Sequence, residues 1–155
     1  MLKDIVVRKA TLDDLPTLQK FEQALIRAER PFDPTIREDP LKYYSLEKIL
    51  TDKNAVVYVA EHLSEIVSCG SVTIREARPY LDHEEFANFG FMFTLKKYRG
   101  FGINGMIMEN CKEWTSLKGF KEMRLTVYTE NQSAIAAYEK VGFKRHLIQM
   151  RMPSK

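Results

Sequence analysis

The stretch TLKKYRGFGINGMIMENCKEW, residues 94–114, contains three closely spaced glycines, Gly100, Gly102 and Gly105. An apolar run precedes the glycines and apolar residues at helical spacing follow them, which predicts a strand, a turn and a helix. Backbone amides at the start of a helix that follows such a turn form a binding site for a phosphate group. The stretch therefore predicts a phosphate-binding turn, and its surroundings decide which of several folds contains it.

The composition indicates one globular domain. The chain has 155 residues, of which 45% are hydrophobic and 29% charged, and we expect a single domain over residues 1–155. It contains no run of about 18 apolar residues and no charged-then-apolar leader, so we expect a cytoplasmic protein with no membrane partner. The net charge of +3 is below that of a typical nucleic-acid-binding domain, and we expect no nucleic-acid partner.

The hydrophobic periodicity predicts alternating strands and helices. Strands are predicted where a run is rich in β-branched residues, alternates between apolar and polar residues, or is apolar throughout. These runs are residues 4–10, 55–62, 65–77, 84–95, 122–129 and 143–152. Apolar stripes and helix-forming residues predict helices over residues 11–30, 45–50, 103–114 and 131–141. The second and third strands are joined by a short polar turn, which predicts a hairpin. We expect an α/β domain with both antiparallel and parallel pairing.

The histidines and cysteines show no pattern of a metal site or a redox pair. His62, His83 and His146 are isolated from one another, and none has the spacing of a metal ligand. Cys69 and Cys111 lie far apart, each within an apolar segment. We therefore expect no bound metal and two reduced cysteines in the core.

Two of the known phosphate-binding turns do not fit this chain. A nucleotide P-loop needs Lys-Ser or Lys-Thr directly after its glycines, and neither dipeptide follows here. The pattern Gly-x-Gly-x-x-Gly also matches a dinucleotide-binding turn, and Glu130 stands about where a ribose-binding acid belongs. However, residues 96–99 separate the strand from the first glycine, and only 25 residues follow Glu130. The further strand–helix units of that fold would not fit into them.

A third phosphate-binding turn is compatible with the chain. YRGFGINGMIME resembles the Gln/Arg-x-x-Gly-x-Gly/Ala turn of the GNAT superfamily of acyl-CoA-dependent N-acetyltransferases, with Arg99 and Gly102 in the matching positions. ENQSAIAAYEKVGFKR resembles the second signature of the superfamily, Asn-x-x-Ala-x-x-x-Tyr-x-x-x-Gly-Phe. The matching residues are Asn131, Ala134, Tyr138, Gly142 and Phe143. The resemblance covers essentially the whole chain and implies a GNAT-type mixed, largely antiparallel central sheet of six to seven strands, with helices on both faces.

The resemblance implies acetyl-CoA as the co-substrate. Amides of the turn would hold the pyrophosphate at the positive end of the helix, and the strand before the turn would splay from its neighbour and pair with the pantetheine arm. The residues implied in cofactor binding are Met92, Phe93, Thr94, Arg99, Gly100, Phe101, Gly102, Ile103, Asn104, Gly105, Asn131 and Tyr138. A solvated loop arginine is the alternative for Arg99. The family has Gly or Ala at the position of Asn104, whose side chain would either crowd the pyrophosphate or donate a hydrogen bond to it.

The same resemblance implies direct transfer of the acetyl group to an amine. Tyr138 matches the family tyrosine that protonates the leaving sulfur, and a phenol is a reasonable acid for a thiolate. The alternative is a core tyrosine spaced with Ile135 and Val141. Glu84 and Glu85 stand roughly where family members often place the base that deprotonates the amine through water, although exposed glutamates are common at the start of a strand. A main-chain amide would face the thioester oxygen.

The acceptor is expected to be an amine, on a small molecule or on a protein. Residues 31–44 contain three prolines and predict a long loop, a kind of segment that is usually functional or mobile. This region shapes the acceptor pocket in the family, but its mixed charge is also that of an ordinary solvated loop. The resemblance also allows a homodimer. A non-catalytic acyl-CoA-binding or sensor module on the same fold is the alternative function.

Overall fold

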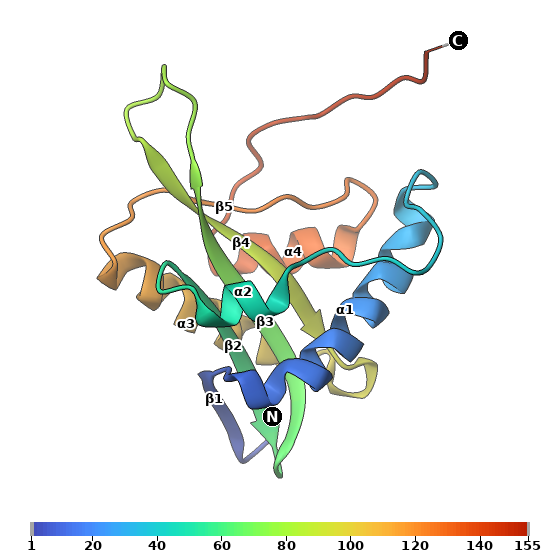
Figure 1. The fold of residues 1–155 in the computed structure, drawn as a ribbon, viewed down its shortest axis with the longest axis vertical. Coiled ribbons are helices and arrows are strands. Elements are labelled where there is room, and N and C mark those ends of the chain that lie inside the picture. Colours follow the sequence, from blue (N-terminus) through green and yellow to red (C-terminus); the bar gives the residue numbers. More distant parts are fainter. Residues whose placement is uncertain (1, 155) are drawn as a thin grey trace.

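The computed structural model describes residues 2–154, which form one five-stranded sheet with helices on both faces (Figure 1). The strands are β1 (Ile5–Lys9), β2 (Ala55–His62), β3 (Glu65–Glu76), β4 (Glu85–Thr94) and β5 (Met123–Arg124). The helices are α1 (Leu15–Glu29), α2 (Leu46–Thr51), α3 (Ile103–Leu117) and α4 (Gln132–Val141). The strands lie in the order of the chain; β1 to β4 are antiparallel and β5 is parallel to β4. The predicted α/β fold with a mixed, largely antiparallel sheet is confirmed.

Two hydrophobic clusters lie on the two faces of the sheet. On one face, α1 and α2 cover a cluster that includes Leu18, Val59 and Phe93. On the other face, α3 covers a cluster that includes Phe89 and Ile107, and α4 packs against its margin. Each helix buries an apolar stripe of the kind that its sequence predicts. No helix within residues 2–154 has the length and apolarity needed to cross a membrane.

The strand β4 changes its side-chain alternation halfway along. Phe89 belongs to the cluster under α3, but Phe91 and Phe93 belong to the cluster under α1, although all three are odd-numbered. The register of β4 against β3 shifts between Cys69 and Ser71, so two residues of β4 lie opposite one residue of β3. Such a β-bulge reverses the faces to which the following side chains point. It allows one strand to supply aromatic side chains to both clusters.

The sheet has five strands rather than the six to seven expected. Only Met123–Arg124 of the predicted strand 122–129 joins the sheet, and residues 143–152 form no strand. This C-terminal segment is extended and projects from the domain (Figure 1). Its exposed apolar residues are Leu147, Ile148, Met150 and Met152. The prediction of a strand over residues 143–152 was wrong because a strand needs a neighbouring strand to pair with. The two residues of β5 offer too few backbone hydrogen-bonding groups for a further strand.

Gly70 and Gly90 provide a matched test of the packing around the bulge. A Cβ on Gly70 would lie 2.5 Å from Sδ of Met92 and 2.6 Å from Cγ2 of Ile107, whereas the atoms nearest to a Cβ on Gly90 would be 3.8 Å away. We expect Gly70→Ala to lower the free energy of unfolding by about 1–3 kcal/mol, the usual cost of overpacking. Gly90→Ala should change it by less than about 1 kcal/mol. Urea unfolding measures both values, and equal losses would contradict the packing described here.

Candidate active site

The strands β4 and β5 diverge after a short parallel pairing. Only Ala87 and Asn88 of β4 pair with Met123 and Arg124 of β5, whereas β4 continues to Thr94 alongside β3. Within residues 2–154, the backbone of β4 beyond Asn88 therefore has a strand partner on one side only. This divergence matches the splayed strand that the family resemblance implies. An unpaired strand edge can form main-chain hydrogen bonds with an extended ligand.

The β-bulge lies within this unpaired edge. Phe91 has a φ of 48°, a conformation that residues with a side chain seldom adopt and that costs about 1–3 kcal/mol. Its amide donates a hydrogen bond to Oη of Tyr44 at 3.1 Å, and the two ring centroids lie 5.0 Å apart. The neighbouring Gly90 has no positive φ, so the strained conformation falls on a residue with a side chain. Backbone strain of this kind clusters at functional sites, where the surrounding structure holds it in place.

The glycine turn connects β4 to α3. Gly100 and Gly102 have φ values of 85° and 79°, in the left-handed region that glycine adopts without strain. The amide of Met106 donates to the carbonyl of Gly102 at 3.2 Å, so the amides before Met106 in the first turn of α3 have no acceptor inside the helix. A Cβ on any of the three glycines of the turn would meet no atom within 4 Å. The turn is therefore open on its outer side, where its amides can bind an anion.

Two side chains flank the turn. Nε of Arg99 donates to the carbonyl oxygen of Thr94 at 3.0 Å, and its guanidinium lies 6.0 Å from the ring centroid of Phe93. The charge of Arg99 is therefore held beside the end of β4. Nδ2 of Asn104 lies 3.5 Å from Sδ of Met108, one helical turn further along α3. Because the Asn104 side chain points along the helix, it does not lie across the amides of the first turn.

The helix α4 presents Tyr138 to the cluster under α3. Oδ1 of Asn131 accepts a hydrogen bond from the amide of Ala134 at 3.3 Å, and Gly142 ends the helix with a φ of 119°. These residues are types that favour the two ends of a helix. Burial, with a smaller contribution from the charge of Glu29, raises the pKa of Tyr138 to about 12. The Tyr138 hydroxyl is therefore protonated throughout the physiological pH range.

Glu29, the last residue of α1, is a partly buried carboxylate that was not among the residues predicted for the site. Burial raises the pKa of Glu29, and the Tyr43 hydroxyl partly opposes this shift. Burial, with an added contribution from the charge of Glu29, also raises the pKa of Tyr128 and of Tyr138. Helical spacing could have revealed this residue, because Glu29 follows the buried Ile26 by three positions.

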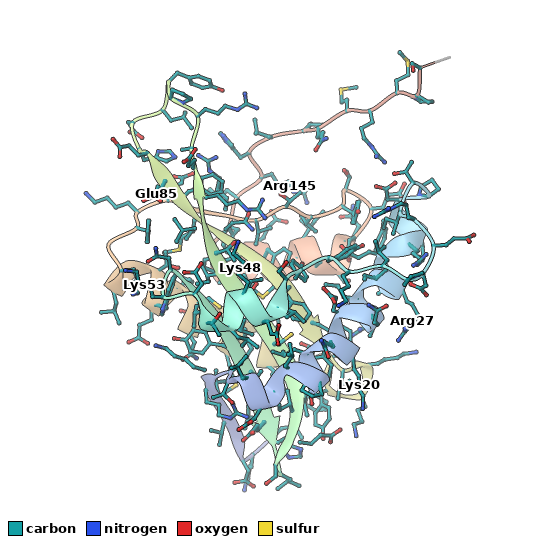
Figure 2. All side chains as sticks on the ribbon, viewed as in Figure 1. Lys20, Arg27, Lys48, Lys53, Glu85 and Arg145 are labelled. Atoms are coloured by element: carbon teal, nitrogen blue, oxygen red, sulfur yellow. The ribbon has the colours of Figure 1, made fainter. Side chains whose placement is uncertain are left out.

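Glu84 and Glu85, the two predicted bases, lie elsewhere. Both are exposed, and Glu85 pairs with Glu76 at the start of β4, near the projecting loop between β3 and β4 (Figure 2). Glu85 precedes Phe91 by six residues, which corresponds to about 20 Å along a strand. The structure thus does not bring these carboxylates to the bulge, and their role as base stays a prediction.

A comparison with family models identifies the class of this protein. The model of the acetyltransferase (GNAT) family matches residues 21–143, a span that contains the bulge, the glycine turn and Tyr138. The chain therefore belongs to the GNAT acetyltransferase family. The comparison with curated protein sequences found no match.

Solved structures share the fold at low sequence identity. A tetramutant of a Bacillus halodurans protein has a TM-score of 0.82 at 18% identity, covering 96% of this chain and 99% of its own. A predicted acetyltransferase from Clostridium acetobutylicum, solved with acetyl-CoA, has a TM-score of 0.75 at 15% identity, covering 97% and 96%. The aminoglycoside N-acetyltransferase AAC(6')-Iy, solved with CoA, has a TM-score of 0.72 at 16% identity, covering 96% and 100%.

The two cysteines give a test of the core. Cys69 and Cys111 are free and buried, as predicted, and burial raises the pKa of Cys69 and raises that of Cys111 to about 12. A thiol reagent at pH of about 8 should therefore titrate no cysteine in the folded protein, because thiolate is the reactive form. It should titrate both cysteines after unfolding in guanidinium chloride. Rapid labelling of either residue in the folded protein would contradict the burial described here.

Proposed function

We propose that this protein is an acetyl-CoA-dependent N-acetyltransferase that moves an acetyl group to a primary amine by direct attack. The observation that supports the proposal is the open edge of β4, with the strained bulge within it and the glycine turn at its end. Acetyl transfer needs a held thioester, a stabilised oxyanion and a proton for the departing thiolate. The edge, its amides and Tyr138 are suited to these three tasks. The two similar proteins solved with acetyl-CoA and with CoA agree with this assignment.

In this proposal, the turn and the edge of β4 hold the cofactor. The amides of residues 100–105 bind the pyrophosphate at the positive end of α3, and Arg99 adds a positive charge beside it. The backbone of residues 92–94 forms hydrogen bonds with the pantetheine arm. A main-chain amide of the same segment donates to the thioester oxygen as negative charge develops there. Tyr44 orients this segment, because its hydroxyl accepts a hydrogen bond from the amide of Phe91.

The chemical step forms a carbon–nitrogen bond and breaks a carbon–sulfur bond. The amine nitrogen attacks the thioester carbonyl carbon, and the Tyr138 hydroxyl donates its proton to the departing CoA thiolate. The pKa of Tyr138, about 12, makes it a weaker acid than a phenol in water. The same desolvation also raises the basicity of a thiolate in this site. Desolvation therefore raises both the pKa of the Tyr138 hydroxyl, which donates the proton, and the basicity of the thiolate that accepts it.

Replacing the Tyr138 hydroxyl tests its role as the acid. We expect Tyr138→Phe to lower turnover by roughly 10²–10⁴, the usual contribution of a positioned acid, and to leave acetyl-CoA affinity unchanged because the ring remains. Release of free thiol measures the first quantity, and the thermal shift with acetyl-CoA measures the second. Unchanged turnover in Tyr138→Phe would exclude this role.

The pH dependence of the wild-type enzyme provides a separate test. Tyr138 must be protonated to act as the acid, and its pKa of about 12 means that the proton is lost only near that pH. Turnover at saturating substrate should therefore show no fall that depends on Tyr138 between about pH 7 and pH 10. A fall in that interval that disappears in Tyr138→Phe would contradict the raised pKa.

Gly105 tests the pyrophosphate site. Because a Cβ at Gly105 would meet no protein atom within 4 Å, and because glycine is a poor helix former, Gly105→Leu should leave the melting temperature unchanged or raise it. The same side chain would stand over the amides of the turn. We expect it to weaken acetyl-CoA binding by on the order of tenfold, about 1.4 kcal/mol. Calorimetric titration measures the affinity, and unchanged affinity would argue against this location of the pyrophosphate.

The alternative function is a non-catalytic acyl-CoA-binding module. A thermal shift with acetyl-CoA but no release of free thiol across a panel of amines would favour the binding module over the N-acetyltransferase.

The homodimer also stays a prediction. Light scattering of the purified protein tests it, and the exposed apolar residues of the C-terminal segment offer a surface for such a contact.

A further inference from the structure

We infer that Tyr98 is a positioning residue for the pyrophosphate of CoA. Its hydroxyl forms hydrogen bonds with His62 and Glu65 of the β2–β3 hairpin and thereby fixes the segment in front of the glycine turn. The inference rests on the cofactor site of the proposed function. It requires that CoA binds there, but it does not require that the acetyl transfer occurs.

The segment between β4 and the glycine turn is not held by the sheet. The amide of Leu95 donates to the carbonyl oxygen of Val67 at 2.9 Å, which continues the pairing of β4 with β3 by one residue. A single turn of 3₁₀ helix, Lys96–Tyr98, then follows. Among the described residues, no backbone hydrogen bond joins residues 96–101 to another element. Side chains must therefore hold this segment against the domain.

The side chain of Tyr98 makes contacts of this kind. Its Oη lies 3.1 Å from Nδ1 of His62 and 3.3 Å from Oε2 of Glu65. Because a carboxylate only accepts, the hydroxyl donates to Glu65, and its oxygen can accept a hydrogen bond from His62. This pattern assigns a proton to Nδ1 of His62. The Tyr98 ring also meets the His62 ring edge-on, with centroids 5.4 Å apart, and packs against the cluster under α3.

The two partners of the hydroxyl lie on a firm support. His62 ends β2, Glu65 begins β3, and the two residues face each other across the hairpin. Leu63 and Ser64, which join them, have φ values of 50° and 67°, an arrangement that suits the twist of a tight hairpin. Lys97 adds an exposed contact, with its Nζ 3.5 Å from Oε2 of Glu65. The hydroxyl is thus held by side chains whose own positions are fixed by strand pairing.

The glycine turn depends on this anchor because its own residues make few contacts. Arg99, the residue after Tyr98, donates through Nε to the carbonyl oxygen of Thr94 at 3.0 Å. Gly100 and Gly102 follow, both with left-handed φ values and without side chains to pack. Since glycine has more conformational freedom than any other residue, the direction of the turn is set by the residues before it and by α3 after it. Tyr98 and Arg99 therefore fix the entrance of the turn.

Amides that are already oriented bind an anion better than mobile ones. They lose less conformational entropy when the ligand arrives, and this saving appears as affinity. Without the Tyr98 hydroxyl, the backbone of residues 96–102 would gain freedom, and pyrophosphate binding would have to offset the cost of ordering it. The pantetheine arm would be unaffected, because its proposed partners are residues 92–94 of β4, a strand that stays paired with β3.

The experiment compares Tyr98→Phe, which removes only the hydroxyl, with Tyr80→Phe, the same change at an exposed position of the loop after β3. CoA is titrated into each protein by calorimetry, and pantetheine, which lacks the pyrophosphate and the nucleotide, is titrated by NMR. We expect Tyr98→Phe to weaken CoA binding by roughly three- to tenfold, the usual contribution of a hydrogen bond. Pantetheine binding and the melting temperature should stay close to the wild-type values, and Tyr80→Phe should match the wild type throughout.

Glu65→Ala tests the hydrogen bond itself. It should weaken CoA binding by itself but add little to the loss in Tyr98→Phe, because both changes break the same contact. Amide hydrogen exchange of residues 100–105 should be faster in both variants than in the wild type. Losses of affinity that simply add would show that Glu65 and Tyr98 act independently, and would overturn the role of the bond.

The outcomes separate this inference from the proposed function. If the wild type and Tyr98→Phe bind CoA equally well, Tyr98 has no positioning role and the proposed function still stands. Equal losses for CoA and pantetheine would also overturn the inference, because the effect would not be confined to the pyrophosphate. If the wild type binds CoA but acetylates no amine, the enzymatic function fails, and a loss in Tyr98→Phe that is selective for CoA still supports the inference. A wild type that binds no CoA would overturn both.

Discussion

The β-bulge at Phe91 is the constraint on which the rest of the structure depends. Without it, Phe89, Phe91 and Phe93 would point to the same face of the sheet; with it, β4 contributes to the clusters under α3 and under α1. The φ of 48° at Phe91 is held by packing on both faces and by the bond from its amide to Tyr44. Both hydrophobic cores therefore stabilise the strained backbone.

The same bulge links the core to the candidate active site. It lies where β4 has lost its neighbour β5, so the strained segment borders the open edge. The strand then runs into the glycine turn, in which left-handed residues turn the first amides of α3 outward. A rigid strand, a fixed bulge and a helix N-terminus in series form a site whose donors are main-chain amides, and such donors need no reorganisation when a ligand binds.

The region around the end of α1 is built differently, from side chains of segments far apart in the sequence. Glu22 holds the loop after α1 through two backbone amides, and the ring of Tyr43 packs edge-on against that of Tyr44. Tyr128 reaches the same region from the chain after β5 and stacks on Phe32. The proposed cofactor site is thus local in sequence, whereas the region around the end of α1 depends on long-range packing.

The sequence by itself determined the elements that depend on local interactions. The glycines of the turn, the Asn131 and Gly142 caps of α4, the apolar helix stripes and the hairpin all follow from residue conformation and spacing. Tertiary structure alone decided what requires a partner from elsewhere. It left residues 143–152 without a strand because β5 is too short to pair with them. It set the left-handed bulge conformation at Phe91, and it left Glu84 and Glu85 exposed. Burial and pairing are properties of the assembled chain, and no short stretch of residues contains them.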